Sequence, residues 1–450
     1  MNPGTVERNR MRSRLLCCES KSKVHSSKLK RILFLAATTG YQTRMFGEAA
    51  ERLGVKLMFA TDRCDQLDDP WSDGAISIRF HQESATLEAL SSAAAQSHID
   101  GILAVGDRPT VIAAYAARLL GLPGHPPEGA IAARDKRLTR ERLLDAGLPG
   151  PELTVVSRLQ DAHSVAKRLT WPCVVKPAAL SGSRGVMRAD DAAQFVHVFE
   201  RLRRLLEAAD VKAMHDPAAE EILIESFIPG REHALEGVLD RGQLQTLAIF
   251  DKPDPLDGPF FEETIYVTPS RASGVQQEAI RNAIAAATRA LGLHHGPIHA
   301  ECRVNERGVF VLEVAARPIG GLCARALRFV GPGQETAGLE ELLLRHALGE
   351  RVEEWRREGA ASGVMMIPIP TGGIYRRVEG IANARAVRYV CDLSITVKAD
   401  QQLVPLPEGS SYLGFIFAKA ETPDVVEQAL RDAHAQLTFV IDRAVPMVTS

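Results

Sequence analysis

Continuous apolar runs separated by helix-forming stretches organise the part of the chain that follows residue 30. Residues 32–36, 55–60 and 99–105 each form such a run, as expected for parallel strands that are covered on both faces. Helical stretches follow the first and third runs and extend to Leu53 and Leu120. Because strands alternate with helices, the pattern predicts a doubly wound parallel α/β domain over residues 30–125.

A turn-rich segment at residues 122–129 separates this domain from a region with a different order of elements. Helices predicted at 130–146, 190–208 and 275–291 stand among strands there, which indicates an α+β region over residues 126–345. The predicted strands of this region include residues 153–156, 172–176, 221–227, 232–239 and 243–250. From about residue 361 the chain is rich in strands again and has a final helix near 425–437, so a smaller α+β domain is predicted over residues 346–450.

The composition is that of an ordinary globular protein, with 45% hydrophobic and 24% charged residues in 450. A net charge of −2 gives no general attraction to nucleic acid or to an anionic membrane. No apolar run reaches the ~18–20 residues of a membrane-spanning helix. The seven cysteines are odd in number and none forms a Cys-x-x-Cys pair, so neither a disulfide framework nor a zinc cage is indicated. A reducing cytoplasm is the expected setting.

Residues 1–29 differ from the rest of the chain, because they are rich in arginine and lysine and hold only a four-residue apolar cluster. That cluster is too short for the core of a signal peptide. We expect a disordered basic extension. A role in targeting or in nucleic-acid binding has little support, since short basic tails are usually only solvated.

Two glutamates twelve positions apart, Glu301 and Glu313, flank a turn that Asn305 and Gly308 predict. If residues 306–308 form a three-residue loop, Glu301 lies directly opposite Glu313 on a β-hairpin. Opposed carboxylates repel each other at ~4.5–5.5 Å between Cβ atoms, and a divalent ion such as Mg²⁺ between them would relieve the repulsion. Alternation places Arg317 on the face of Glu313, as in a phosphate clamp. A solvated face of alternating charges is the ordinary alternative.

Four further features could belong to the same site. Lys136 begins a helix, and Lys176 closes an apolar strand. Residues 181–185, Ser-Gly-Ser-Arg-Gly, form a flexible loop whose backbone N–H groups could close over phosphates. Glu225 lies in an apolar strand and Glu232 follows seven residues later. Each feature alone is also compatible with ordinary surface lysines, turns and edge strands.

The order and spacing of these features together resemble the ATP-grasp superfamily over about residues 30–440. Within that superfamily the resemblance is greatest to the L-amino-acid ligases that form dipeptides. Residues 363–370 and 411–418 look like the C-terminal domain of that group, and Phe261-Glu262-Glu263-Thr264 is similar to one of its motifs. The chain lacks the Gly-x-x-x-x-Gly-Lys-[Ser/Thr] sequence of P-loop enzymes.

The resemblance implies a central two-lobed ATP-grasp domain between the α/β and α+β domains, and a role for each matching residue. The implied ATP-binding residues are Lys136 and Lys176 on the phosphates, Ser181, Gly182, Ser183 and Gly185 in the covering loop, Glu225 and the Phe227 backbone at adenine, and Glu232 at the ribose. The implied residues for the remaining roles are Glu301 and Glu313 as magnesium ligands, Arg317 as the phosphoryl-stabilising arginine, and Gly320 with Gly321 as a substrate-carboxylate loop. His299 either lines the site or is a satisfied buried histidine.

One position departs from the superfamily pattern. An asparagine commonly stands two residues after the second metal glutamate, where this chain has Ala315. Another ligand must then replace it, and Glu263 is the candidate. The departure also leaves open a reading of weakened catalysis.

The implied activity is ATP-dependent ligation of a carboxylate to an amine, here two amino acids, through an acylphosphate. ATP and Mg²⁺ are the implied cofactors, with Mn²⁺ as an alternative to Mg²⁺. Amino acids are the expected partners, a homodimer is usual among such ligases, and neither a membrane nor nucleic acid is expected. The alternatives are a carboxylating enzyme related to biotin carboxylase, an ATP-binding regulatory protein, and, with least support, a nucleic-acid-binding module.

Overall fold

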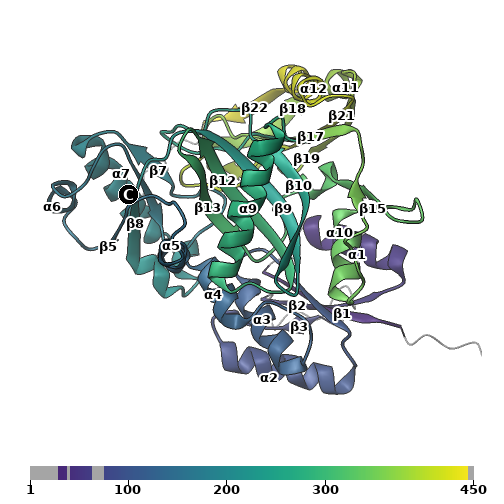
Figure 1. Ribbon diagram of the computed structural model, residues 1–450. Coiled ribbons are helices and arrows are strands. Elements are labelled where there is room, and N and C mark those ends of the chain that lie inside the picture. Colours follow the sequence, from purple (N-terminus) through teal and green to yellow (C-terminus); the bar gives the residue numbers. More distant parts are fainter. Residues whose placement is uncertain (1–28, 38–40, 63–74, 444–450) are drawn as a thin grey trace, which may run out of the picture.

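The computed structural model describes residues 29–37, 41–62 and 75–443 (Figure 1). Almost all of the predicted basic extension lies outside the described residues, as do residues 38–40 and 63–74. Among the helices that are described, none is long and apolar enough to cross a membrane.

The N-terminal unit is a parallel sheet in the order β3-β2-β1-β4 with helices beside it. Its elements are β1 (Arg31–Ala36), α1 (Tyr41–Leu53), β2 (Lys56–Thr61), β3 (Ile76–Ser77), α2 (Glu83–Gln96), β4 (Gly101–Val105) and α3 (Pro109–Leu120). Ile32 and Phe34 pack into one hydrophobic core and Leu33 and Leu35 into another. The continuous apolar run therefore marks a strand covered on both faces, and the predicted α/β fold is confirmed.

The helix predicted over residues 130–146 is two helices, α4 (Pro127–Arg134) and α5 (Lys136–Asp145). Asp135 separates them in an extended conformation, and its carboxylate accepts hydrogen bonds from the backbone N–H groups of Arg137 and Leu138. This is an N-cap, which begins a new helix at a place where hydrophobic periodicity alone predicts one continuous helix. Lys136 thereby becomes the first residue of α5.

A small antiparallel sheet with the order β5-β8-β6-β7 follows. Its elements are β5 (Leu153–Ser157), α6 (Ala162–Ala166), β6 (Cys173–Pro177), β7 (Met187–Ala189), α7 (Ala192–Leu206), α8 (Ala209–Lys212), a 3₁₀ turn (Pro217–Glu220) and β8 (Glu221–Ser226). Phe195, Phe199 and Leu202 of α7 pack against this sheet. The sheet lies to one side of the molecule in Figure 1.

A large antiparallel sheet of eight described strands has the order β13-β12-β9-β10-β11-β17-β21-β19. Its strands are β9 (Arg231–Asp240), β10 (Gln243–Asp251), β11 (Ile265–Thr268), β12 (Gly296–Asn305), β13 (Gly308–Ala315), β17 (Ala361–Ile367), β19 (Val390–Ile395) and β21 (Gly414–Ala420). Helix α9 (Gly274–Leu291) covers one face through Ile280, Ile284 and Leu291 (Figure 1). Helix α12 (Pro423–Ala435) covers the later strands through Val426 and Leu430.

The remaining elements lie between strands of the large sheet along the chain or follow α12. They are a 3₁₀ turn (Cys323–Ala326), β14 (Arg328–Val330), β15 (Thr336–Gly338), α10 (Leu339–Ala347), β16 (Arg356–Arg357), β18 (Gly373–Glu379), α11 (Ile381–Ala386), β20 (Gln402–Leu403) and β22 (Thr438–Asp442). The boundary proposed between residues 345 and 346 falls inside α10, and the large sheet includes strands from both sides of it. The proposed domain limits stay predictions.

The hairpin of β12 and β13 pairs Glu301 with Glu313 as predicted, but for a different reason. Asn305 pairs with Gly308, so the loop is the two residues 306 and 307 and the predicted three-residue loop is wrong. The register then shifts by one residue at a β-bulge beyond Cys302, and the bulge restores the pairing of the two glutamates.

Candidate active site

A cavity of about 560 Å³ opens between the small sheet, the large sheet and the loop after β4. Its volume lies within the ~300–1,000 Å³ usual for small-molecule sites. The predicted site residues in its wall are Lys136, Lys176, Ser181, Gly182, Ser183, Glu225, Phe227, Glu232, Glu263, His299, Glu301, Glu313, Arg317, Gly320 and Gly321. Residues from positions 136 to 321 thus meet at one site, and their individual roles stay predictions.

Gly185 is the predicted site residue that the structure does not place in the cavity wall. Its N–H donates to the carbonyl oxygen of Pro407 at 2.8 Å, and its φ is +78°. A Cβ at this position would lie 2.9 Å from Cδ1 of Leu202. Gly185 therefore holds the underside of the loop against α7 and the C-terminal segment, whereas Gly182 and the two serines face the cavity.

The two predicted phosphate-binding lysines approach the cavity from different elements. Lys136 Nζ donates to the Leu180 carbonyl oxygen at 2.9 Å and lies 3.8 Å from Glu313 Oε2. Lys176, at the end of β6, pairs with Glu225 Oε2 at 2.7 Å. Burial lowers the pKa of Lys176, although Glu225 opposes this effect. Both ammonium groups are thus held in place by acceptors of the protein itself.

Glu225 makes a second ion pair that the sequence did not reveal. Arg140 of α5 is almost completely buried, and its Nε lies 3.3 Å from Glu225 Oε1. Burial would raise the pKa of Glu225, but the charges of Lys176 and Arg140 hold it below its ordinary value. A carboxylate held by two cations remains ionised at neutral pH.

Three glutamates surround the ammonium group of Lys252, the residue after β10. Its Nζ donates to Glu232 Oε1 at 2.8 Å and to Glu301 Oε1 at 2.7 Å, and it also donates to Glu263. Burial opposes the charge on Lys252, yet the three carboxylates raise its pKa well above the ordinary value. Lys252 therefore stays positive.

The pKa values of the neighbouring carboxyl groups of Glu263 and Glu301 are shifted in opposite directions. Burial and the charge of Glu301 raise the pKa of Glu263 to about 7. Burial acts on Glu301 too, but Lys252 and His299 bring its pKa well below the ordinary value. Glu263 is therefore protonated more readily than Glu301. The hydroxyl of Tyr266 donates to Glu263 Oε1 at 2.9 Å.

These carboxylates form a donor set that suits a hard divalent ion. Oxygens of Glu232, Glu263 and Glu301 lie within 4.8 Å of one another. Glu313 faces the same cavity, and its ion pair with Lys136 is long, at 3.8 Å. A cation was expected between Glu301 and Glu313, and at Glu301 the ammonium group of Lys252 supplies that positive charge. Glu232, the predicted ribose ligand, also accepts from Arg303 Nε at 3.0 Å.

His299 lines the cavity and also has a buried partner, so the two alternatives considered for this residue do not exclude each other. Its Nδ1 lies 3.0 Å from Glu236 Oε2, and its Nε2 lies 3.6 Å from Glu301 Oε1. Burial disfavours the charged ring, but the two carboxylates raise the pKa of His299 to about 9. The ring is therefore an imidazolium at neutral pH. It stands on β12 directly opposite Ala315, which is buried and supplies no ligand.

Arg317 is anchored by a residue of the N-terminal unit. Its Nε donates to Oδ1 of Asp107 at 2.9 Å, and Asp107 lies in the loop after β4 and lines the cavity. Burial opposes the charge on Arg317, but Asp107 raises its pKa, so the guanidinium remains positive. The N-terminal unit thus positions a side chain that faces the predicted phosphate end of the cavity.

Sequence reasoning missed four residues that hold the site together, namely Asp107, Arg140, Glu236 and Lys252. Two of them carried a usable signal. Glu236 is a lone acid inside the apolar run of β9, and Lys252 follows an apolar strand. A charged residue in such a place needs a buried partner. Asp107 and Arg140 gave no comparable signal, because their partners lie 210 and 85 residues away.

Three family models match the chain, and together they extend over most of it. They describe an ATP-grasp N-terminal domain at residues 47–124, an ATP-grasp domain at 169–326, and an L-amino acid ligase C-terminal domain 2 at 365–442. With the fold and the cavity described above, these matches show that the chain belongs to the ATP-grasp superfamily.

Within that superfamily the chain resembles the L-amino-acid ligase group and stands among ATP-dependent ligases that form carbon–nitrogen bonds. An L-amino acid ligase from Bacillus licheniformis superposes with a TM-score of 0.74 and 25% identity, covering 93% of this chain and 100% of that one. Alanine–anticapsin ligase of Bacillus subtilis is 28% identical over 46% of this chain and 46% of its own length. An uncharacterized protein of Sinorhizobium fredii is 25% identical over 92% of this chain and 84% of its own. The match to the Bacillus subtilis ligase thus spans about half of that protein.

Proposed function

We propose that this protein joins two amino acids by an ATP-dependent carboxylate–amine ligation that passes through an acylphosphate. The observation that carries the proposal is the cavity in which lysines, carboxylates and Arg317 converge from three parts of the chain. The likeness to an L-amino acid ligase over nearly the whole chain supports the choice of substrates.

In the proposed reaction, a carboxylate oxygen of the first amino acid attacks the γ-phosphorus of ATP, and ADP leaves. The amine nitrogen of the second amino acid then attacks the acyl carbon, and phosphate leaves as the amide forms with loss of a proton from nitrogen. No covalent bond to the protein is needed, so the protein acts by position and by electrostatics.

The side chains of the cavity have charges suited to these steps. Lys136 and Lys176 bind the phosphates of ATP, and Arg317 neutralises charge on the phosphoryl group as it moves. Gly320 and Gly321 hold a substrate carboxylate, and the His299 imidazolium adds a fixed positive charge near Glu301. The loop at residues 181–185 excludes water, which would otherwise hydrolyse the acylphosphate.

Glu301 and Glu313, with Glu263 in place of the usual asparagine, are the residues that would hold Mg²⁺ or Mn²⁺. Such an ion lowers the energy of negative charge on the phosphate oxygens during transfer. Lys252 already neutralises part of the same carboxylate cluster, so the protein binds the ion with less excess negative charge than three free glutamates would offer.

A phosphate-release screen over pairs of amino acids with ATP and Mg²⁺, followed by mass spectrometry of the product, tests the proposal. With an active pair, Glu313→Ala is expected to abolish ADP formation. Glu306→Ala removes an exposed glutamate from the turn of the same hairpin and is expected to leave it unchanged. Full turnover in Glu313→Ala would contradict the proposal.

A second candidate is an ATP-binding regulatory protein. Ala315 offers no metal ligand, and Lys252 already neutralises two of the proposed metal ligands, Glu263 and Glu301. Tight ATP binding without ADP release across the whole panel would favour it. Release of ADP that depends on bicarbonate and needs no amino acid would instead favour a carboxylating enzyme of the biotin carboxylase type.

A further inference from the structure

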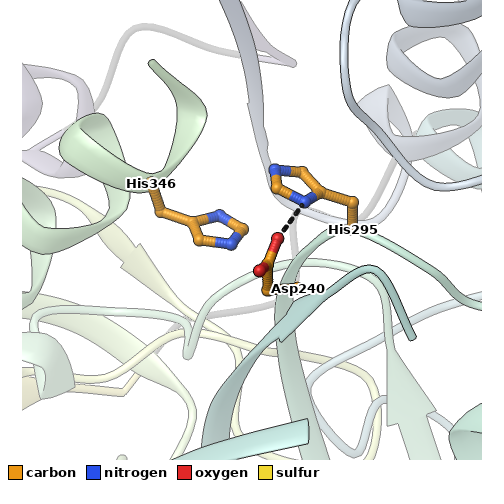
Figure 2. Close-up of side chains that lie close together, drawn as sticks. All are labelled: Asp240, His295 and His346. Carbon is orange, nitrogen blue, oxygen red and sulfur yellow. Dashed lines mark hydrogen bonds and ion pairs between the residues drawn. The ribbon is translucent and has the colours of Figure 1, made fainter. Parts of the chain in front are cut away.

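A second cluster of ionisable side chains lies at the far end of β9 and β12 from the glutamates of the cavity. Asp240 is the last residue of β9, His295 directly precedes β12, and His346 lies in the last turn of α10. Figure 2 shows the three side chains converging from these separate elements. Asp240 is four residues beyond Glu236 on β9, which is ~13 Å along an extended strand, so the cluster is separate from the catalytic cavity.

One potential ligand atom from each of the three side chains lies within 4.8 Å of the other two. His295 Nδ1 is 3.2 Å from Asp240 Oδ1. The rings of His295 and His346 are stacked, with centroids 4.2 Å apart and planes 16° apart. Ligands of a tetrahedral Zn²⁺ ion are ~3.3 Å apart when the bonds are ~2.0 Å long, so the Asp240–His295 pair already has that spacing and the rest needs shifts of at most ~1.5 Å.

The hydrogen bonds of the described residues leave this cluster unsatisfied. Nε2 of His346 is buried and has no hydrogen-bond partner in the described part of the chain. Nε2 of His295 is unpaired there too, but it lies on the other side of the ring from Nδ1, the nitrogen that faces Asp240. His346 as a whole is only 3% exposed. Because an unpaired buried nitrogen is unfavourable, a structure normally retains one only where something binds it. Figure 2 shows the His346 ring turned toward Asp240.

The surroundings of the two rings suit a metal ion better than a proton. Burial lowers the pKa of His346 to about 4 and also lowers that of His295, so burial favours the neutral form of both rings. A neutral ring presents one lone pair, and a metal ion would take the place of the proton between His295 Nδ1 and Asp240. A cavity of about 40 Å³ adjoins both rings, and a water molecule needs ~10–15 Å³ of such space. His125 lines the same cavity, but its Nδ1 accepts from the His294 N–H and its Nε2 faces the Pro297 carbonyl oxygen.

We propose that Asp240, His295 and His346 form a structural site for a borderline divalent cation of the Zn²⁺ type, with water as the fourth ligand. Two imidazoles and one carboxylate are ligands typical of Zn²⁺, whereas Mg²⁺ prefers oxygen alone. The ion would tie the end of α10 to the junction of β9 and β12. This inference does not depend on the proposed ligase activity.

Zinc titration of the metal-stripped full chain, in excess Mg²⁺ that saturates the carboxylates of the cavity, tests the site without ATP or amino acids. The wild-type protein is expected to bind one Zn²⁺ with a dissociation constant in the micromolar range or below. His346→Ala and Asp240→Asn should each weaken this binding at least tenfold. His294→Ala removes an exposed histidine from the same loop and should leave it unchanged.

Two further measurements separate loss of the site from loss of the fold. Asp240 is exposed and Asp240→Asn keeps its shape, so a normal circular dichroism spectrum with weakened Zn²⁺ binding supports the site. Zn²⁺ should also raise the melting temperature of the wild-type protein but not that of His346→Ala. Equal affinity in wild type, His346→Ala and Asp240→Asn would overturn the proposal, as would the absence of Zn²⁺ binding by the wild type.

Discussion

Replacing Lys252 by methionine removes the one ammonium group shared by Glu232, Glu263 and Glu301. The side chain of Lys252 is 3% exposed, and its Nζ bonds to Glu232 and Glu301 are 2.8 and 2.7 Å long. Methionine retains most of the volume of the side chain, so the change is mainly electrostatic. Because removal of one partner from a buried ion pair typically costs ~3–5 kcal/mol, we expect Lys252→Met to lower the free energy of unfolding by about that amount at pH 7.5.

The size of this loss should depend on pH, with a sign that follows from linkage. Without Lys252, burial and the charge of Glu301 raise the pKa of Glu263 still further above its unfolded value, because Lys252 no longer opposes them. A carboxyl group with a raised pKa stabilises the fold below its unfolded pKa, near 4.3, and loses that contribution as the pH rises through the folded pKa. The deficit of Lys252→Met should therefore be small near pH 5 and reach its full size above pH 7.

Urea unfolding followed by circular dichroism at pH 5 and at pH 7.5 provides the measurement. Lys419→Met is the matched control, because Lys419 is half exposed and pairs with Glu358 at the surface. Such pairs contribute only ~0–1 kcal/mol, so this variant should show a small loss with little dependence on pH. A loss below ~1 kcal/mol in Lys252→Met at pH 7.5 would refute the role assigned to Lys252.

Three further predictions concern other parts of the site. The stability that protonated His299 provides is complete below about pH 6.5 and is lost as the pH rises through about 9. Urea unfolding of the wild type should therefore show a loss of ~3 kcal/mol over this pH range, and His299→Gln should not show it. Identical pH profiles for the two proteins would contradict this prediction. Asp107→Asn should release Arg317 and lower kcat ~10–100-fold in the ADP-release assay with an active amino-acid pair, and unchanged kcat would contradict the anchoring role. Arg201→Gln breaks the ion pair with Glu408, and this pair helps to fix the segment that packs behind the loop at 181–185. Water should then hydrolyse more of the acylphosphate, so more ADP should form for each amide made. An unchanged ratio of ADP to amide would exclude this role of the ion pair.

The sequence alone was sufficient for the class of fold, and all but one of the predicted site residues line the same cavity, although their roles stay predictions. Apolar runs located the strands, because burial on both faces demands them, and the order of motifs led to the superfamily. Helix ends were harder to predict. Asp135 divides one predicted helix into two through hydrogen bonds of its side chain, and hydrophobic periodicity does not report such bonds.

The hairpin of β12 and β13 shows most clearly what the amino-acid sequence decides and what the tertiary structure decides. The acids at 301 and 313 and their turn are written in the sequence, but their alignment depends on a β-bulge that no residue type announces. The sequence shows that Glu236 and Lys252 need buried partners, but it does not show which partners, and Asp107 gives no signal at all. Each acts on a partner brought close by sheet order or by packing of the N-terminal unit, and the charge state of the site depends on those distances and on burial. The sequence thus determined which chemical groups are present, whereas the tertiary structure decided which charges meet out of water.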